Sequence, residues 1–216
     1  MRRILLTAAV ISLAGISQSG CGASRPSKYY QLDAPAPAAT SADPLPISLL
    51  VGRISAARIY RDDRIIYEST PLEMGMYEYH RWAEPPAEMV QAMLVQTLRS
   101  SGLYRSVDRL GSSAKGDYIL RGRLMALDEV DHPSISARVS FDLELFSLKT
   151  GTTIWTQSYS HDDPVSAIET KKKKKADVQV GSVVEALNRN LQQGIQKLTG
   201  ELGQFLTSHP APSATR

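Results

Sequence analysis

The sequence predicts an α+β fold in which an antiparallel or mixed β-sheet carries two helices on one face. Residues 135–145 alternate strictly between apolar and polar side chains, which is typical of a strand with one buried and one solvated face. Residues 177–207 and 86–101 instead repeat apolar residues at steps of three and four, which predicts two amphipathic helices. Because strands precede each helix along the chain, the elements fit a two-layer α+β sandwich.

Three short strands are expected before the first helix. They cover residues 47–53, 64–69 and 74–81. Pro85 and Pro86 follow the third strand, and they can form the first turn of a helix but cannot continue a central strand. The third strand therefore ends near Arg81, the helix begins at Pro85 or Pro86, and Gly102 ends it.

A second group of strands follows the first helix. We expect a short strand over residues 103–107 and then an antiparallel meander of three strands over residues 117–130, 135–145 and 153–160. The apolar residues of the last helix form one stripe: Val180, Val184, Leu187, Leu191, Ile195, Leu198, Leu202 and Phe205. The stripe indicates a face packed on the sheet, with a coiled coil or a lipid-facing surface as alternatives. Four glycines are expected to weaken this helix: Gly181, Gly194, Gly200 and Gly203.

The N-terminus has the features of a secretory signal. Arg2 and Arg3 precede an apolar run over residues 4–16, and small residues then lead to Cys21, the only cysteine in the chain. We therefore expect residues 1–20 to be a signal peptide and Cys21 to be acylated. An ordinary cleaved signal that leaves an inert thiol is the alternative. Several acyl chains on Cys21 would hold the protein on a membrane.

Two low-complexity segments flank the predicted domain, which covers residues 47–207. Residues 21–46 are rich in Ser, Ala and Pro and are expected to form a lipidated tether, and residues 208–216 a disordered tail. Within the tether, residues 29–32 (Tyr-Tyr-Gln-Leu) are too aromatic for a spacer. We expect them to be pinned to the domain or to a partner.

The overall charge gives no indication of nucleic-acid binding. The chain has 25 basic and 22 acidic residues, and loss of the signal would remove two basic residues and leave a net charge of +1. One run of like charge lies between the last strand and the last helix: Lys171, Lys172, Lys173, Lys174 and Lys175. Such a run favours a solvated loop, and its functional interpretation is contact with anionic lipid head groups.

No motif in the sequence indicates catalysis. The chain has no G-x-S-x-G elbow, Walker A motif, G-x-G-x-x-G, C-x-x-C or H-E-x-x-H. Two acidic groups beside histidines could suggest a metal or acid–base site: Asp128, Glu129, Asp131 and His132, and His161, Asp162 and Asp163. Carboxylates at strand ends are usually solvated turn residues, so we predict a protein that is not an enzyme and uses no cofactor or metal.

Aromatic residues gather where the third strand meets the first helix. Tyr77 and Tyr79 are expected to share one face of that strand, and Trp82 lies at the bend. Trp82 either closes the end of the core or faces a partner. Our hypothesis is that five aromatic residues form a surface that docks a partner protein: Tyr29, Tyr30, Tyr77, Tyr79 and Trp82.

Several short motifs occur in an order that resembles the ABC-type transport auxiliary lipoprotein family. They are a lipobox-like end at Cys21, with Gln18 in place of the usual Leu, and residues 29–32 (YYQL), 82–85 (WAEP) and 101–104 (SGLY). The resemblance covers almost the whole chain after Cys21. It implies a fold similar to the N-terminal domain of the translocation protein TolB and a non-catalytic accessory role.

The same resemblance implies partners and a location. Lipoproteins of this family serve ABC-type transport of lipids or organic solvents, with a mammalian-cell-entry-type periplasmic protein, a permease and an ATPase as partners. The lipoprotein docks the periplasmic assembly to the outer membrane, and the family also allows homo-oligomers. Gly22 follows Cys21 where inner-membrane lipoproteins carry Asp, which also favours the outer membrane.

Two other functions remain open on the sequence alone. A periplasmic lipid carrier would enclose an acyl-sized apolar cavity, and a hydrolase would bring polar groups from the acidic hairpin ends together in a cleft. A docking protein would instead have a filled core and an exposed aromatic patch.

Overall fold

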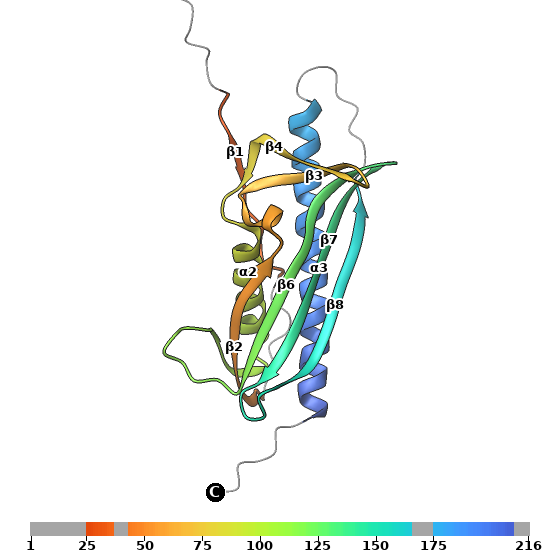
Figure 1. Ribbon diagram of the computed structural model, residues 1–216. Coiled ribbons are helices and arrows are strands. Elements are labelled where there is room, and N and C mark those ends of the chain that lie inside the picture. The colour runs from red at the N-terminus through yellow and green to blue at the C-terminus, as the bar shows by residue number, and fades with distance from the viewer. Residues whose placement is uncertain (1–24, 37–42, 166–174, 210–216) are drawn as a thin grey trace, which may run out of the picture.

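A mixed sheet of eight strands carries both long helices on one face (Figure 1). The computed structural model describes residues 25–36, 43–165 and 175–209. The elements are β1 (Lys28–Tyr30), β2 (Leu45–Ala56), the 3-10 helix η1 (Arg58–Arg61), β3 (Arg64–Thr70), β4 (Glu73–Trp82), α2 (Pro86–Ser100), β5 (Tyr104–Arg109), β6 (Tyr118–Asp131), β7 (Ile135–Ser147), β8 (Thr152–Pro164) and α3 (Lys175–Ser208). The predicted α+β class is confirmed.

Strand β6 is the centre of the sheet. One of its edges pairs in parallel with β2 over its first half and with β3 over its second half. Its other edge pairs with antiparallel β7, and antiparallel β8 follows, so the predicted meander of three strands is confirmed. Beyond β2 lies parallel β5, and beyond β3 lie antiparallel β4 and then β1, which ends the sheet parallel to β4.

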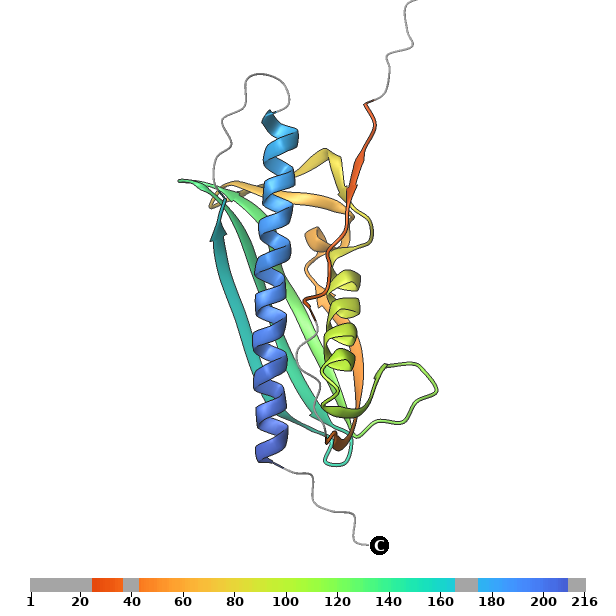
Figure 2. The same cartoon turned by 180° about the vertical axis from the view of Figure 1, so that it is seen from behind.

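The two helices lie side by side over this sheet (Figure 2). Helix α2 packs on β2 and β5, and α3 packs on β7 and β8. The predicted stripe of α3 is buried from Val180 to Leu202, which confirms the interpretation as a core face. It shifts at the end of the helix, where Phe205 is only partly buried and Leu206 is 1% exposed. No helix within the described ranges combines the length and the apolar character that crossing a membrane requires.

Glycines in α3 allow close packing instead of simply weakening the helix. A Cβ atom at Gly194 would lie 2.6 Å from Cδ1 of Tyr159 and 2.9 Å from Cε1 of Phe141, both on the meander. A Cβ atom at Gly203 would lie 2.7 Å from Cδ2 of Leu103. The helix therefore approaches the sheet and the start of β5 more closely than any larger residue would permit.

The N-terminal segment joins the fold from Lys28 onward. Strand β1 pairs with the end of β4, and Leu32 is 4% exposed in the core. The N–H of Asp33 then donates to Oδ1 of Asn188 on α3 at 2.9 Å. Residues 29–32 are thus pinned to the domain, which was one of the two alternatives. The predicted boundary between tether and domain, at residue 46, falls inside β2, which begins at Leu45. The composition of residues 21–46 did not indicate that some of their apolar side chains pack on the domain.

Candidate functional site

A bulge in β4 separates the tyrosines that were expected to share one face. Between the pairs Ile66↔Met76 and Arg64↔Arg81, β4 has three more residues than β3, so the alternation of side chains is broken there. The Tyr77 hydroxyl turns toward the helix side and donates to Oε2 of Glu129 at 2.7 Å. Tyr79 is half-buried and instead contacts Arg25 of the N-terminal segment. The expectation of one shared face is therefore wrong.

Two further members of the predicted aromatic surface point into the fold. Trp82 is 0% exposed and closes the end of the core, so its assignment to a partner surface is corrected to the structural alternative. Tyr30 lies opposite Trp82 in the register, and its hydroxyl is 2.9 Å from Nδ1 of the buried His80. Because large aromatic rings bury much apolar area, this end of the sheet gains stability by enclosing them.

Two of the five predicted aromatic residues remain outside the core: Tyr29, which is exposed, and Tyr79, which is half-buried. The Tyr29 side chain is 64% exposed and lies on the outer side of β1 with its register partner Arg81. The Arg25 guanidinium lies 5.1 Å from the centre of the Tyr79 ring, in a cation–π contact. Arg81 is held in place by Asp63 at 2.6 Å. We call these four residues, Arg25, Tyr29, Tyr79 and Arg81, the β1–β4 surface.

The first acidic group of the sequence is split between the two faces of the sheet. Asp128 is bound to Arg138 on the face away from the helices, and Glu129 is bound to Tyr77 and to Gln179 of α3. Burial raises the pKa of both carboxyls, and hydrogen bonds from these partners oppose the rise. Consecutive strand residues point in opposite directions, so the two acids cannot act on one substrate.

The second acidic group lies along β8 without converging. Asp163 is 3.5 Å from Arg189 of α3, and the His161 carbonyl accepts a hydrogen bond from Asn190. Over the described ranges of the chain, no three His, Cys, Asp or Glu side chains come together as a group that could hold a metal ion.

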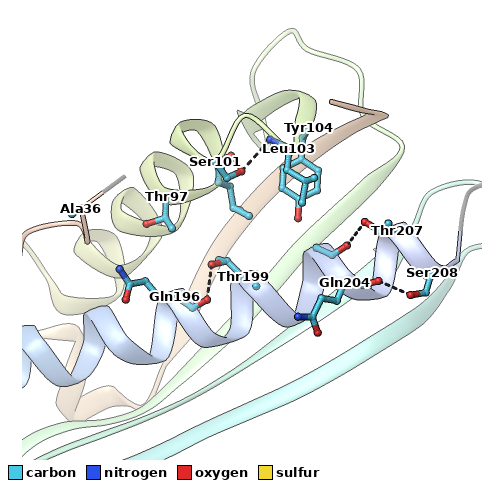
Figure 3. Close-up of a pocket in the computed structure, with 13 residues that line it drawn as sticks. Ala36, Thr97, Ser101, Leu103, Tyr104, Gln196, Thr199, Gln204, Thr207 and Ser208 are labelled. Carbon is cyan, nitrogen blue, oxygen red and sulfur yellow. Dashed lines mark hydrogen bonds between the residues drawn. The ribbon is translucent and has the colours of Figure 1, made fainter. Parts of the chain in front are cut away.

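A pocket opens between the C-terminal halves of α2 and α3 (Figure 3). Its volume is about 580 Å³, which falls within the range of small-molecule sites. Leu98 and Leu103 form apolar wall. A Cβ atom at Gly200 would meet nothing within 4 Å, so this residue leaves the α3 side open, whereas Gly203 packs closely on Leu103. Tyr104 at the start of β5 faces α3. The sequence did not predict this pocket, and the glycine at position 200 of the predicted helix was the available signal.

Two predicted sites cannot be located in the structure. Cys21 and four of the lysines, residues 171–174, lie outside the described residues, and Lys175 is the first residue of α3. Acylation of Cys21 and lipid contact by the lysine run therefore stay predictions.

Comparisons with known proteins agree with this architecture. A model of the ABC-type transport auxiliary lipoprotein component family matches residues 30–201. The crystal structure of protein XCC0632 from Xanthomonas campestris is similar, with a TM-score of 0.69 and 22% identity over 84% of this chain and 99% of that chain. The hypothetical protein CT253 from Chlamydia trachomatis has a TM-score of 0.50 and 7% identity over 76% of this chain and 99% of that chain. At these identities the likeness shows the fold alone. No curated protein sequence matches the chain.

Proposed function

Because this chain belongs to the family of ABC-type transport auxiliary lipoprotein components, we propose that it is a non-catalytic accessory protein that docks a periplasmic transport assembly to the outer membrane. The assembly is one of the mammalian-cell-entry type, with its ABC permease and ATPase, and it moves lipids or organic solvents. The protein is anchored through acyl chains on Cys21.

The place of β1 is the observation that carries this proposal. Only six residues separate Cys21 from Lys28, the first residue of β1, so the connecting chain reaches at most about 25 Å. A lipid on Cys21 would therefore keep the β1 end of the sheet close to the membrane. Residues 22–27, and not the whole of residues 21–46, would then connect the lipid to the domain.

The β1–β4 surface supplies the contact with the partner. Tyr29 on β1, the strand that ends the sheet, and Tyr79 on the neighbouring β4 present amphipathic rings, and Arg25 and Arg81 border them with positive charge. Tyrosine and arginine are the residue types that most often dominate binding at protein interfaces, where one anchor can contribute about 2 kcal/mol or more. We expect the mammalian-cell-entry-type periplasmic protein to bind here.

The test is capture of that periplasmic protein, produced from the gene neighbourhood of this chain, by a double variant with Tyr29→Ser and Tyr79→Ser. We expect at least about a 30-fold loss of affinity, since two anchors of interface quality are removed. A matched control replaces two exposed leucines in turns outside this surface, Leu110→Ser and Leu148→Ser, which are 47% and 46% exposed. Undiminished capture by the folded tyrosine variant would remove this surface as the docking site.

The anchor needs its own experiment. With the same leader, Cys21→Ser should release the protein from washed outer membranes into the soluble periplasmic fraction, because it removes the only thiol that can be acylated. Retention of the variant in the membrane fraction would refute lipid anchoring and would leave the docking surface to be judged by capture alone.

A further inference from the structure

The pocket between α2 and α3 has uncharged walls. None of the described residues that line it is Lys, Arg, His, Asp or Glu. A charged group drawn into such a site would lose its hydration without gaining a counter-charge, which is costly. The bound part of any ligand must therefore be neutral.

Most hydroxyl groups around the pocket are already satisfied. Thr199 donates to the carbonyl of Ile195 at 2.7 Å, and Thr207 donates to the carbonyl of Gly203 at 2.8 Å. Ser101 donates to the carbonyl of Leu98 in the same way, at 2.8 Å. Hydroxyls bound back to their own helix offer no further hydrogen to a ligand, and the amides of Gln196 and Gln204 lie on exposed residues, so the deeper lining is mainly carbon.

Two buried hydroxyls differ from these. The Oγ1 atom of Thr97 and the Oη atom of Tyr104 are buried and have no hydrogen-bond partner among the described residues. Tyr104 is 7% exposed, and its ring lies between α2 and α3 with the hydroxyl directed toward α3 (Figure 3). Because a buried hydroxyl without a partner is costly, these two atoms indicate where a ligand would supply an acceptor.

We propose that this pocket binds the acyl-ester part of a neutral lipid. The acyl chain lies along the apolar wall, and the ester carbonyl accepts a hydrogen bond from the Tyr104 hydroxyl. Burial raises the pKa of Tyr104, so its hydroxyl keeps the proton that it would donate. The site goes beyond the docking function and shares no residue with the β1–β4 surface. Failure of either proposal therefore leaves the other standing.

A peptide segment fits the pocket less well than an acyl ester. Each residue of a peptide brings one N–H and one C=O that must find partners when buried. Among the described residues, the buried part of the pocket offers two unpartnered hydroxyls, and the amides of Gln196 and Gln204 belong to exposed residues of the lining. Several buried peptide groups would therefore lack partners. One ester group needs only one or two hydrogen bonds, so the number of polar atoms matches a lipid.

The experiment titrates the full mature chain, carrying Cys21→Ser so that no detergent is needed, with 1-monolauroylglycerol below its micellar concentration. Calorimetry should show saturable binding, and laurate at pH 8 should bind at least about tenfold more weakly, because it has the same chain with a charge. Equal binding of the two probes, or no saturable binding of 1-monolauroylglycerol, would overturn the proposal.

Two glycines of α3 provide a matched pair of variants. A Cβ atom at Gly200 or at Gly181 would meet nothing within 4 Å, but only Gly200 lines the pocket. Gly200→Leu should fill the pocket and abolish binding while the protein stays folded, because leucine favours a helix more than glycine does. Gly181→Leu should bind as the unaltered chain does. Binding that survives Gly200→Leu would show that the lipid binds elsewhere.

Tyr104→Phe tests the polar contact. It removes the hydroxyl but keeps the ring, so we expect about a tenfold loss of affinity for 1-monolauroylglycerol. The melting temperature should not fall, since that hydroxyl has no partner among the described residues. A fall in melting temperature with unchanged affinity would assign the hydroxyl to the structure and refute its role in binding.

Discussion

Replacing Arg138 with Met would leave two carboxylates without their cation on the face of the sheet away from the helices. Arg138 lies opposite Asp128 in the register and holds it with two hydrogen bonds, Nη2 to Oδ2 at 2.6 Å and Nε to Oδ1 at 3.1 Å. Arg138 also donates to Glu68, whose other oxygen is 2.8 Å from Nε2 of His132. The Tyr60 hydroxyl of η1 covers Asp128 at 3.3 Å.

The cost of this substitution follows from the burial of Asp128, which is 0% exposed. Removing one partner of a buried ion pair typically costs about 3–5 kcal/mol, because the remaining charge is uncompensated. For a chain of this length, each kcal/mol lowers the melting temperature by about 2–4 °C, so we expect a loss of roughly 6–20 °C. Met retains much of the apolar stem of the arginine side chain, so lost packing contributes little to the expected fall in melting temperature.

Thermal denaturation followed by circular dichroism measures the effect, with Arg121→Met as the control. Arg121 also pairs across β6 and β7, 2.8 Å from Glu144, but these side chains are 43% and 38% exposed. Exposed pairs contribute about 0–1 kcal/mol, so the control should lose only a few degrees. Equal losses in the two variants would refute the argument that burial makes the Arg138 network costly to break.

The pH dependence gives a second, independent check. Burial raises the pKa of Asp128, and Arg138 opposes the rise, so Arg138→Met should raise the pKa further. A carboxyl with a raised pKa stabilises the fold below its ordinary pKa of about 3.9 and loses that contribution as the pH rises through the folded value. The loss of stability caused by Arg138→Met, relative to the unaltered chain, should therefore become smaller as the pH falls from 7.5 to 5. A loss of stability that stays constant over this pH range would contradict an electrostatic origin of the effect of Arg138→Met.

Two other predictions concern α3 and the loop before it. Gly194→Ala should lower the free energy of unfolding in urea by about 1–3 kcal/mol through its contacts with Tyr159 and Phe141, whereas Gly181→Ala should raise it by up to about 1 kcal/mol. Replacing the five lysines of residues 171–175 with Ser should leave the melting temperature nearly unchanged and weaken binding to phosphatidylglycerol vesicles at low salt. A loss of several degrees in that variant would show structural contacts of the lysines.

The sequence predicted the elements best where a pattern repeats along one strand or helix. In β7, Ala137, Val139 and Phe141 are buried and Arg138 and Ser140 are less so, as strict alternation requires. The stripe of α3 is equally regular over six turns. Local periodicity reports which face is apolar, and a single sheet with helices on one face is then the arrangement that buries every apolar face.

The candidate site was harder to predict because its geometry depends on pairing between distant segments. The bulge that turns Tyr77 inward is defined by the register of β4 against β3, and the alternation of β4 alone gives no indication of it. Trp82 had two interpretations for the same reason, since a ring at a bend is buried only if other elements cover it. Tyr29 and Tyr79 were identified as accessible aromatics, but their separation from Tyr77 needed the structure.

The glycines of α3 show most clearly why local propensity was insufficient. In the interior of a helix, glycine costs about 1 kcal/mol relative to alanine, and the sequence analysis interpreted all four as a weakness. At Gly194 the contact with Tyr159 explains the residue, because no Cβ atom fits. At Gly200 no such contact exists, and packing alone would favour a larger side chain. A pocket that must stay open for a neutral lipid explains why position 200 carries glycine. If the Gly200→Leu protein is stable but no longer binds 1-monolauroylglycerol, lipid binding accounts for both the glycine and the pocket.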